Sequence, residues 1–211
     1  MIIESALHED RICWPTNLAD WMALSEDESG ELIDGKLTEE EVPDALHEVI
    51  VAWVIGVLRG VLIAQGGLVL GSEAKFAVSA RRGRKPDASA YFPGTRKPPR
   101  RALITAPPDL MIEVVSPTPR DARRDRVEKL AEYAAFGVRW YVIIDPEERL
   151  LELLELGADG RYVHAASAAD GVVSDIPGFH GITLDLDALW REVEQLGPAS
   201  SEALEEAPPS P

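Results

Sequence analysis

The sequence feature that most constrains the fold is a carboxylate inside an apolar run of strand length. Residues 110–115 read Leu-Met-Ile-Glu-Val-Val, which is typical of a strand that is covered on both faces. Burying the ionised side chain of Glu113 there costs several kcal/mol unless the carboxylate is paired, protonated or bound to a metal. The sequence therefore predicts a partner for Glu113, either an arginine in a structural ion pair or a metal ion.

Three Pro-Asp pairs supply candidates for a second carboxylate at such a metal. Asp44 stands where the N-cap of a long helix is expected, and capping explains it. Asp109 lies four residues before Glu113 on the same strand, about 13 Å away along the backbone, which is too far to share one ion. Asp87 lies 26 residues before Glu113. A neighbouring strand can bring these two carboxylates together.

Apolar periodicity with Gly and Pro punctuation predicts a mixture of helices and strands. Helices are expected over 18–24, 45–64, 120–136 and 187–196. Strands are expected over 68–78, 88–92, 110–115, 140–144, 150–156, 162–166 and 181–186, with an Asp-Gly hairpin over 31–37 and a basic loop over 81–85. The order strand, helix, strand between residues 110 and 144 predicts a parallel crossover.

The chain of 211 residues fits one domain. We expect an N-terminal arm over 1–17, a single domain over 18–196 and a disordered, acidic and proline-rich tail over 197–211. Cys13 is the only cysteine, which excludes an internal disulfide and a cysteine zinc site. The longest apolar run, 49–58, is too short to span a membrane. We therefore expect a cytoplasmic protein with no membrane segment.

Charge is distributed unevenly along the chain. The net charge is −16, yet residues 81–129 hold 13 of the 21 basic residues and six acidic ones, a net charge of +7. A basic segment in an otherwise acidic chain is expected where one face meets a polyanion, and the alternative is a set of solvated loops.

A set of short motifs is spread over most of the chain. They are Pro86-Asp87, PDLMIEVVSPT at 108–118, ELIDG at 31–35, Asp145-Pro146, and the single residues His47, Asp125, Lys129, Tyr133, Gly137 and Tyr141. Together they resemble the Uma family of restriction-endonuclease-like proteins within the PD-(D/E)XK nuclease superfamily, over roughly residues 18–190. The resemblance implies an α/β (α+β) fold with a restriction-endonuclease-like core, in which helices flank a mixed central sheet.

The resemblance also implies a metal site and a reaction. Asp87 and Glu113, with the main-chain carbonyl of Val114, would bind Mg²⁺, for which Mn²⁺ can substitute, and the metal would activate water. Glu48 is a further candidate acid, on the first long helix. The implied activity is metal-dependent hydrolysis of DNA phosphodiester bonds.

The lysine of the superfamily pattern is displaced in this chain. Val115 stands two residues after Glu113, where the catalytic lysine is expected, and similar family members offer a lysine from the following helix, here Lys129. Asp125 and Lys129 are at i and i+4, which a surface salt bridge also explains. A helical wheel puts Lys129 nearly opposite an apolar stripe of the helix. Aromatic residues near Lys129 indicate that its side of the helix is covered by the protein as well. The stripe consists of Val127, Leu130, Ala131 and Ala134, and the aromatic residues are Tyr133 and Phe136. The sequence is therefore compatible with a solvent-exposed Lys129 side chain and with a buried one.

Two functions remain open: an endonuclease, and a catalytically inactive descendant of the fold that binds nucleic acid or a protein partner. For the endonuclease, DNA is the expected partner and a homodimer is expected, because cutting both strands commonly requires two active sites. The candidate DNA-backbone contacts are Arg81, Arg82, Arg84, Lys85, Arg100, Arg101, Arg123 and Arg124. Because the chain has no Gly-rich phosphate loop and no Gly-x-Ser-x-Gly motif, we expect no nucleotide cofactor and no serine nucleophile.

Overall fold

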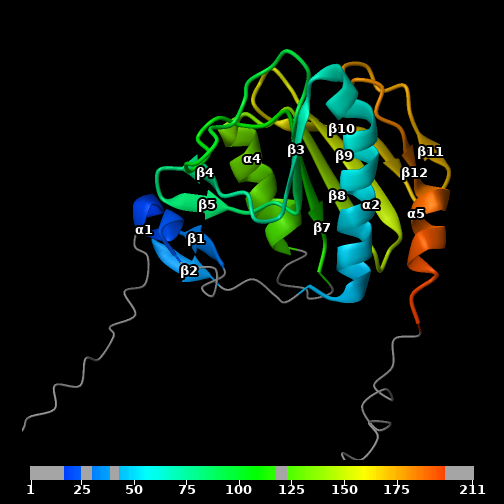
Figure 1. Ribbon diagram of the computed structural model, residues 1–211, viewed down its shortest axis with the longest axis horizontal. Helices are drawn as coiled ribbons and strands as arrows, with labels where there is room; N and C mark the ends of the chain where they lie inside the picture. The colour runs from blue at the N-terminus through cyan, green and yellow to red at the C-terminus, as the bar shows by residue number, and fades with distance from the viewer. Residues whose placement is uncertain (1–16, 25–29, 39–42, 117–122, 198–211) are drawn as a thin grey trace, which may run out of the picture.

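The structure is a computed structural model that describes residues 17–24, 30–38, 43–116 and 123–197. In chain order the elements are α1 (Leu18–Met22), β1 (Glu31–Ile33), β2 (Lys36–Thr38), α2 (Ala45–Leu62), η1 (Ile63–Gln65), β3 (Leu68–Gly71), β4 (Phe76–Ser79), β5 (Arg82–Arg84), β6 (Ala88–Tyr91), β7 (Leu110–Val114), η2 (Arg124–Lys129), α4 (Leu130–Phe136), β8 (Trp140–Asp145), β9 (Leu150–Leu156), β10 (Tyr162–Ala168), β11 (Val172–Val173), β12 (Leu184–Asp185) and α5 (Leu186–Val193) (Figure 1). The expected arm and tail lie almost entirely outside the described residues, so their boundaries stay predictions.

The main sheet has six strands in the order β10-β9-β8-β7-β6-β3. Strands β7 and β8 are parallel, and every other neighbouring pair in this sheet is antiparallel. The sheet is therefore mixed, as expected, and the predicted crossover between β7 and β8 is confirmed. It runs through η2 and α4.

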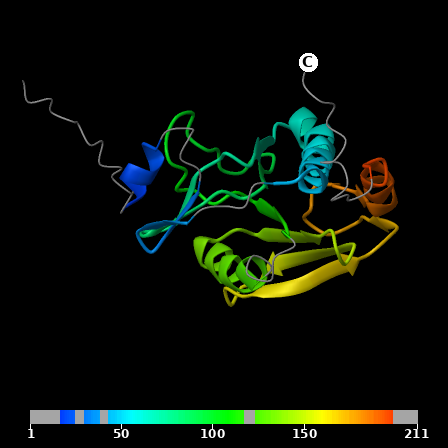
Figure 2. The ribbon, with the colours of Figure 1, turned by 90° about the horizontal axis from the view of Figure 1, so that it is seen from below.

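Strand β7 lies inside the sheet and packs on both faces. Leu110, Ile112 and Val114 belong to the apolar cluster that contains α2 and α5, whereas Met111 belongs to a second cluster with Tyr133 of α4. Because side chains alternate along a strand, Glu113 lies on the same face as Met111. Figure 2 shows α2 and α5 together at one end of the molecule and α1 with the first hairpin at the other.

Helix α2 begins at its predicted cap and covers one face of the sheet. The Asp44 side chain accepts a hydrogen bond of 2.8 Å from the His47 amide, as an N-cap should. Among the described residues, one helix, Ala45–Gln65, is long and apolar enough by length and composition to cross a membrane. Core helices pass the same test, and α2 buries Val54 and Leu58 completely in the main apolar cluster.

A second, smaller sheet has the order β2-β1-β5-β4 and lies on the side of α1 (Figure 1). The predicted Asp-Gly hairpin joins β1 to β2, with positive φ values of 51° at Asp34 and 80° at Gly35, which the tight turn requires. The expected loop over 81–85 is wrong, because residues 82–84 form β5. This strand pairs with both β1 and β4, so pairing partners far away in sequence override its loop-like composition.

The helix before β8 begins with an unexpected turn. Residues Arg124–Lys129 form a π-helix, and the α-helix proper starts at Leu130. A π-turn changes the angular position of each following side chain relative to an α-helix. Val127, expected in the buried stripe, is 56% exposed, and Lys129 is buried.

Gly83 offers a test of how the small sheet packs. A Cβ at this position would lie 2.3 Å from Cζ3 of Trp21, whereas a Cβ at Gly56 on α2 would have no neighbour within 4 Å. We expect Gly83→Ala to lower the free energy of unfolding by about 1–3 kcal/mol. The control Gly56→Ala should raise it by up to about 1 kcal/mol, because alanine favours a helix interior. Urea unfolding measures both, and equal effects of the two substitutions would contradict this packing.

Candidate active site

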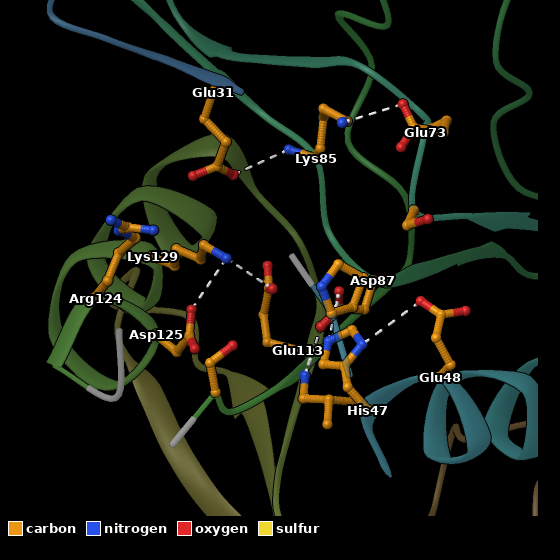
Figure 3. Close-up of a pocket in the computed structure, with 14 residues that line it drawn as sticks. Glu31, His47, Glu48, Glu73, Lys85, Asp87, Glu113, Arg124, Asp125 and Lys129 are labelled. Carbon is orange, nitrogen blue, oxygen red and sulfur yellow. Dashed lines mark hydrogen bonds and ion pairs between the residues drawn. The ribbon is translucent and has the colours of Figure 1, made fainter. Parts of the chain in front are cut away.

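A polar pocket opens at the end of the main sheet where β7 ends and α2 begins (Figure 3). The cavity has a volume of about 140 Å³. Its lining residues are Glu31, Pro43, His47, Glu48, Ser72, Glu73, Lys85, Asp87, Glu113, Val114, Ser116, Arg124, Asp125 and Lys129. They come from α2, η2, the small sheet and adjacent strands of the main sheet, so only the folded chain assembles them.

Asp87 and Glu113 meet at this pocket because β6 and β7 are adjacent. Ala88 pairs with Ile112 across the two strands, which places the residue before β6 beside the end of β7. The Asp87 Oδ2 atom accepts a hydrogen bond of 2.7 Å from the amide of Val114. The two carboxylates singled out from the sequence therefore line one cavity.

Glu113 is 2% exposed and has a cation as partner. Its Oε2 lies 2.7 Å from Nζ of Lys129, and its Oε1 accepts a hydrogen bond of 2.5 Å from the hydroxyl of Tyr133. Arginine as the ion-pair partner is therefore wrong; the partner is a lysine. The pKa of Glu113 is well above its usual value. Burial and the negative charges of Asp87 and Asp125 raise the pKa more than the ammonium of Lys129 lowers it.

Lys129 is 7% exposed, so the surface salt bridge considered from the sequence is wrong. Its Nζ lies 3.0 Å from Oδ1 of Asp125, in addition to its contact with Glu113, and both carboxylates are buried. Burial alone would lower the pKa of Lys129, but the charges of Glu113, Glu31 and Asp125 raise it well above its usual value. The ammonium therefore stays charged, and two of its three N–H groups are directed at carboxylates.

His47 connects α2 to the site. Its Nε2 lies 3.2 Å from Oδ1 of Asp87, and its buried Nδ1 has no hydrogen-bond partner among the described residues. Burial alone would lower the pKa of His47, but the hydrogen bond and charge of Asp87, with the charge of Glu48, raise it. The Glu48 side chain is 64% exposed, at the rim.

A buried ion-pair network supports the pocket from the side of the small sheet. Arg84 is fully buried and donates to Oε2 of Glu31 at 2.6 Å and to both carboxylate oxygens of Glu132 on α4, at 2.7 and 2.8 Å. Oε1 of Glu31 accepts the amide of Lys85 at 3.1 Å. These contacts tie β1 and β5 to the helix that follows Lys129. The sequence analysis assigned no separate role to Glu31. The one sequence feature that could have indicated its burial is its position directly before two apolar residues of the hairpin.

The basic segment does not form one DNA-binding face. Arg84 as a DNA-backbone contact is wrong, because its guanidinium is buried between two carboxylates. Arg82 pairs with Asp34 and Glu132, and Lys85 is buried at the pocket. Arg82 and Arg84 are therefore paired with acids from outside the segment, Glu132 of α4 and residues of the first hairpin.

Some of the other candidate DNA contacts lie at the pocket, and others lie at the opposite end of the strands. Arg124 is half-buried in the pocket wall, and Arg81 and Arg123 are exposed. Arg100 and Arg101 are also exposed, but their loop joins the ends of β6 and β7 that are farther from Asp87 and Glu113.

The donor set fits a hard divalent cation. Among the described residues there is no group of three or more His, Cys, Asp or Glu side chains arranged to hold a metal. Mg²⁺ usually binds through one or two carboxylates and keeps several waters, which Asp87 and Glu113 can provide. Each of their oxygens has a protein partner, but a carboxylate offers about four lone-pair sites and can accept a further ligand. The neighbouring carboxylates that raise the pKa of Glu113 also make the pocket attractive to a cation.

A sequence model of the Uma2 family, described as "Putative restriction endonuclease", matches residues 17–187. The chain belongs to the Uma2 family. The chain is also similar to a solved structure from Anabaena variabilis ATCC 29413 that is described as a "putative nuclease belonging to DUF820". The TM-score is 0.65 and the sequence identity is 19%, and the match covers 85% of this chain and 99% of the Anabaena chain. The likeness confirms the expected restriction-endonuclease-like fold. No curated protein matches the chain.

The central ion pair of this Uma2 family member can be tested by its effect on stability. Lys129→Met leaves Glu113 and Asp125 buried without their ammonium, so we expect the free energy of unfolding to fall by about 3–5 kcal/mol. Glu113→Gln also breaks the pair, but Lys129 keeps the carboxylate of Asp125, so we expect a smaller loss of stability than in Lys129→Met. Urea unfolding in EDTA measures both, and a Lys129→Met variant as stable as wild type would contradict a buried ion pair.

The pH dependence of stability tests the contact between Glu31 and Arg84. Burial alone raises the pKa of Glu31, but the charges of Lys129 and Arg84 and the amide of Lys85 lower it. A lowered pKa contributes stability above the unfolded value of about 4.3, and this contribution is lost as the pH falls through the folded value. We expect Glu31→Gln to destabilise the protein more at pH 7 than at pH 3 by urea unfolding. A constant difference would contradict the lowered pKa.

Proposed function

We propose that this protein is a metal-dependent DNA endonuclease that hydrolyses phosphodiester bonds. The observation that carries the proposal is that Asp87, directly before β6, and Glu113, on the adjacent β7, line one pocket with the buried ammonium of Lys129. Membership of a family described as "Putative restriction endonuclease" supports DNA as the substrate class.

In this proposal Asp87 and Glu113, with the main-chain carbonyl of Val114, would hold Mg²⁺ or Mn²⁺. When bound, the metal supplies Lewis acidity, which activates water and stabilises negative charge on the phosphoryl group. His47 orients Asp87 through its contact with Oδ1, and the Val114 amide fixes the other oxygen. Both contacts restrict the carboxylate to one orientation, as partners of metal ligands commonly do.

Lys129 and Tyr133 prepare Glu113 for this role. The ammonium favours the ionised carboxylate, which is the form that binds a metal, and the Tyr133 hydroxyl holds the second oxygen. The third N–H of Lys129 is available to the substrate. In this proposal Lys129 takes the role that the superfamily pattern gives to a lysine at the position of Val115.

Further parts of the proposal concern DNA and assembly. Arg124 in the pocket wall and the adjacent, exposed Arg123 are suited to contact the phosphate backbone at the site, and exposed Arg81 is a candidate for a contact outside the pocket. Glu48 at the rim is a candidate for an additional acid near the metal. Cleavage of both strands would use two copies of the chain as a homodimer.

One observation favours the second candidate function, a catalytically inactive nucleic-acid-binding protein. All four carboxylate oxygens of Asp87 and Glu113 have partners within the protein, so groups of the chain itself satisfy both carboxylates. Under this alternative the protein binds DNA in a salt-dependent manner and does not turn it over.

Plasmid cleavage distinguishes the two functions. With supercoiled plasmid and Mg²⁺ or Mn²⁺, we expect wild type to produce nicked and linear DNA and EDTA to stop the reaction. Loss of an outer-shell partner typically costs about 10–100-fold, so loss of a ligand in Asp87→Asn or Glu113→Gln should lower the rate at least about 100-fold.

Lys36→Gln is the matched control, because Lys36 is exposed on the hairpin, outside the pocket. It should cleave like wild type. Cleavage that survives Glu113→Gln would rule out the proposed site, and binding without metal-dependent cleavage would favour the inactive protein.

A further inference from the structure

Helix α2 carries an apolar surface on the side that faces away from the main sheet. The most apolar window of the segment Ala45–Gln65 has a mean hydropathy of 1.9, yet only 28% of that window is buried. Figure 2 shows the sheet on one side of α2 and no described helix or strand on the opposite side. We call this surface the outer face of α2, and its exposed or half-buried apolar residues are Val49, Ala52, Trp53, Gly56, Gly60 and, in η1, Ile63.

Packing within one copy of the chain does not explain the outer face. Its members recur at intervals of three and four residues, which is the spacing by which one helix packs on another. A Cβ at Gly56 or Gly60 would have no neighbour within 4 Å, although glycine destabilises a helix interior relative to alanine. Small residues at every fourth position, here with Ala52, let the backbone of a second helix approach closely.

Two exposed charges border the outer face, Glu48 near the start of α2 and Arg59 near its end. Eleven residues make about three helical turns, so the two side chains lie on the same side of the helix, about 16 Å apart along its axis. Glu48 lies 3.9 Å from Nδ1 of His47, and none of the acids in the described part of the chain pairs with Arg59. The face therefore has a negative charge at one end and a positive charge at the other.

This charge pattern is complementary to a reversed copy of itself. A two-fold axis at the level of Trp53, perpendicular to two antiparallel α2 helices, places Glu48 of each copy opposite Arg59 of the other. The same arrangement brings Ala52 of one copy against Gly56 of the other. A parallel arrangement would instead place like charges together, which is unfavourable. The antiparallel pair therefore satisfies both the apolar residues and the charges.

We infer that two copies of the chain associate through the outer faces of their α2 helices, packed antiparallel. The inference rests on the proposed function for its purpose, because it gives an interface to the homodimer that cleavage of both strands would use. Glu48 belongs both to α2 and to the pocket rim (Figure 3). The contact would therefore place both pockets on one side of the helix pair, with Arg59 of the second copy at each rim. A membrane surface fits this face less well, because helices that lie on membranes carry several lysines or arginines.

Sedimentation equilibrium of the full chain, in EDTA and without DNA, measures the association. We expect wild type to approach twice the chain mass of 23.0 kDa as its concentration rises. Ala52→Glu places a charge in the middle of the interface and should raise the dissociation constant at least about 100-fold. The matched control is Ala165→Glu, at an exposed position of the edge strand β10. It should associate like wild type.

Charge reversal tests the orientation of the two helices. Arg59→Glu or Glu48→Arg places like charges opposite each other twice in the dimer, and each should raise the dissociation constant about 2–30-fold. The double variant exchanges the two charges and restores both pairs, so it should return to within about 3-fold of wild type. A merely structural role of either side chain predicts that the two losses add. Both positions are exposed, so these variants decide the question even if Ala52→Glu fails to fold.

The outcomes separate this interface from the nuclease proposal. Wild type that stays monomeric at about 0.1 mM, where a dimer with a micromolar dissociation constant would form, would overturn the interface even if plasmid is cleaved. A dimer that survives Ala52→Glu, that Ala165→Glu disrupts, or whose charge reversals do not cancel would also overturn it. A dimer with the expected response to all these variants, in a protein that cleaves no plasmid, would overturn the nuclease proposal and keep the interface.

Discussion

The contact between the carboxylate of Glu113 and the ammonium of Lys129 is the interaction on which the candidate site depends. An ionised glutamate inside a sheet is tolerated only if a cation replaces the water it has lost. The lysine is buried as well, so each group makes the burial of the other acceptable. Asp125 and Tyr133 complete the arrangement, and the π-turn at the start of the helix is the local geometry that directs Asp125 and Lys129 inward. An energetically costly cluster of this kind, lining a cavity, is more typical of a functional site than of a core.

The small sheet supports this site from the side. Arg84 joins Glu31 on the first hairpin to Glu132, three residues after Lys129, so the position of the helix depends on a strand far away in sequence. The same network fixes the chain immediately before Asp87. The pocket around Glu113 is therefore assembled from segments far apart in sequence, and the guanidinium of Arg84 is directed inward because it pairs with Glu31 and Glu132.

The strands of the main sheet and the helices that pack on it were predictable from the sequence, because they are long apolar runs bounded by Pro-Asp pairs or glycines. The sequence also predicted that Asp87 and Glu113 would meet, because a buried charge requires a partner and adjacent strands can supply one. The burial of Lys129 could not be read from a helical wheel, since the wheel assumes an α-helix and the turn is π. The pocket positions of Glu31 and Lys85 also escaped prediction, because β5 has the composition of a loop and becomes a strand only by pairing with β1 and β4.

The most direct test of the central claim is a crystal structure of the full chain soaked in Mn²⁺, with anomalous scattering used to locate the metal. The account predicts an anomalous peak in contact with Asp87 and Glu113, with the Lys129 ammonium still beside Glu113. Crystals with no peak at these two carboxylates, or with Mn²⁺ bound only by the exposed acids at the rim, would contradict it.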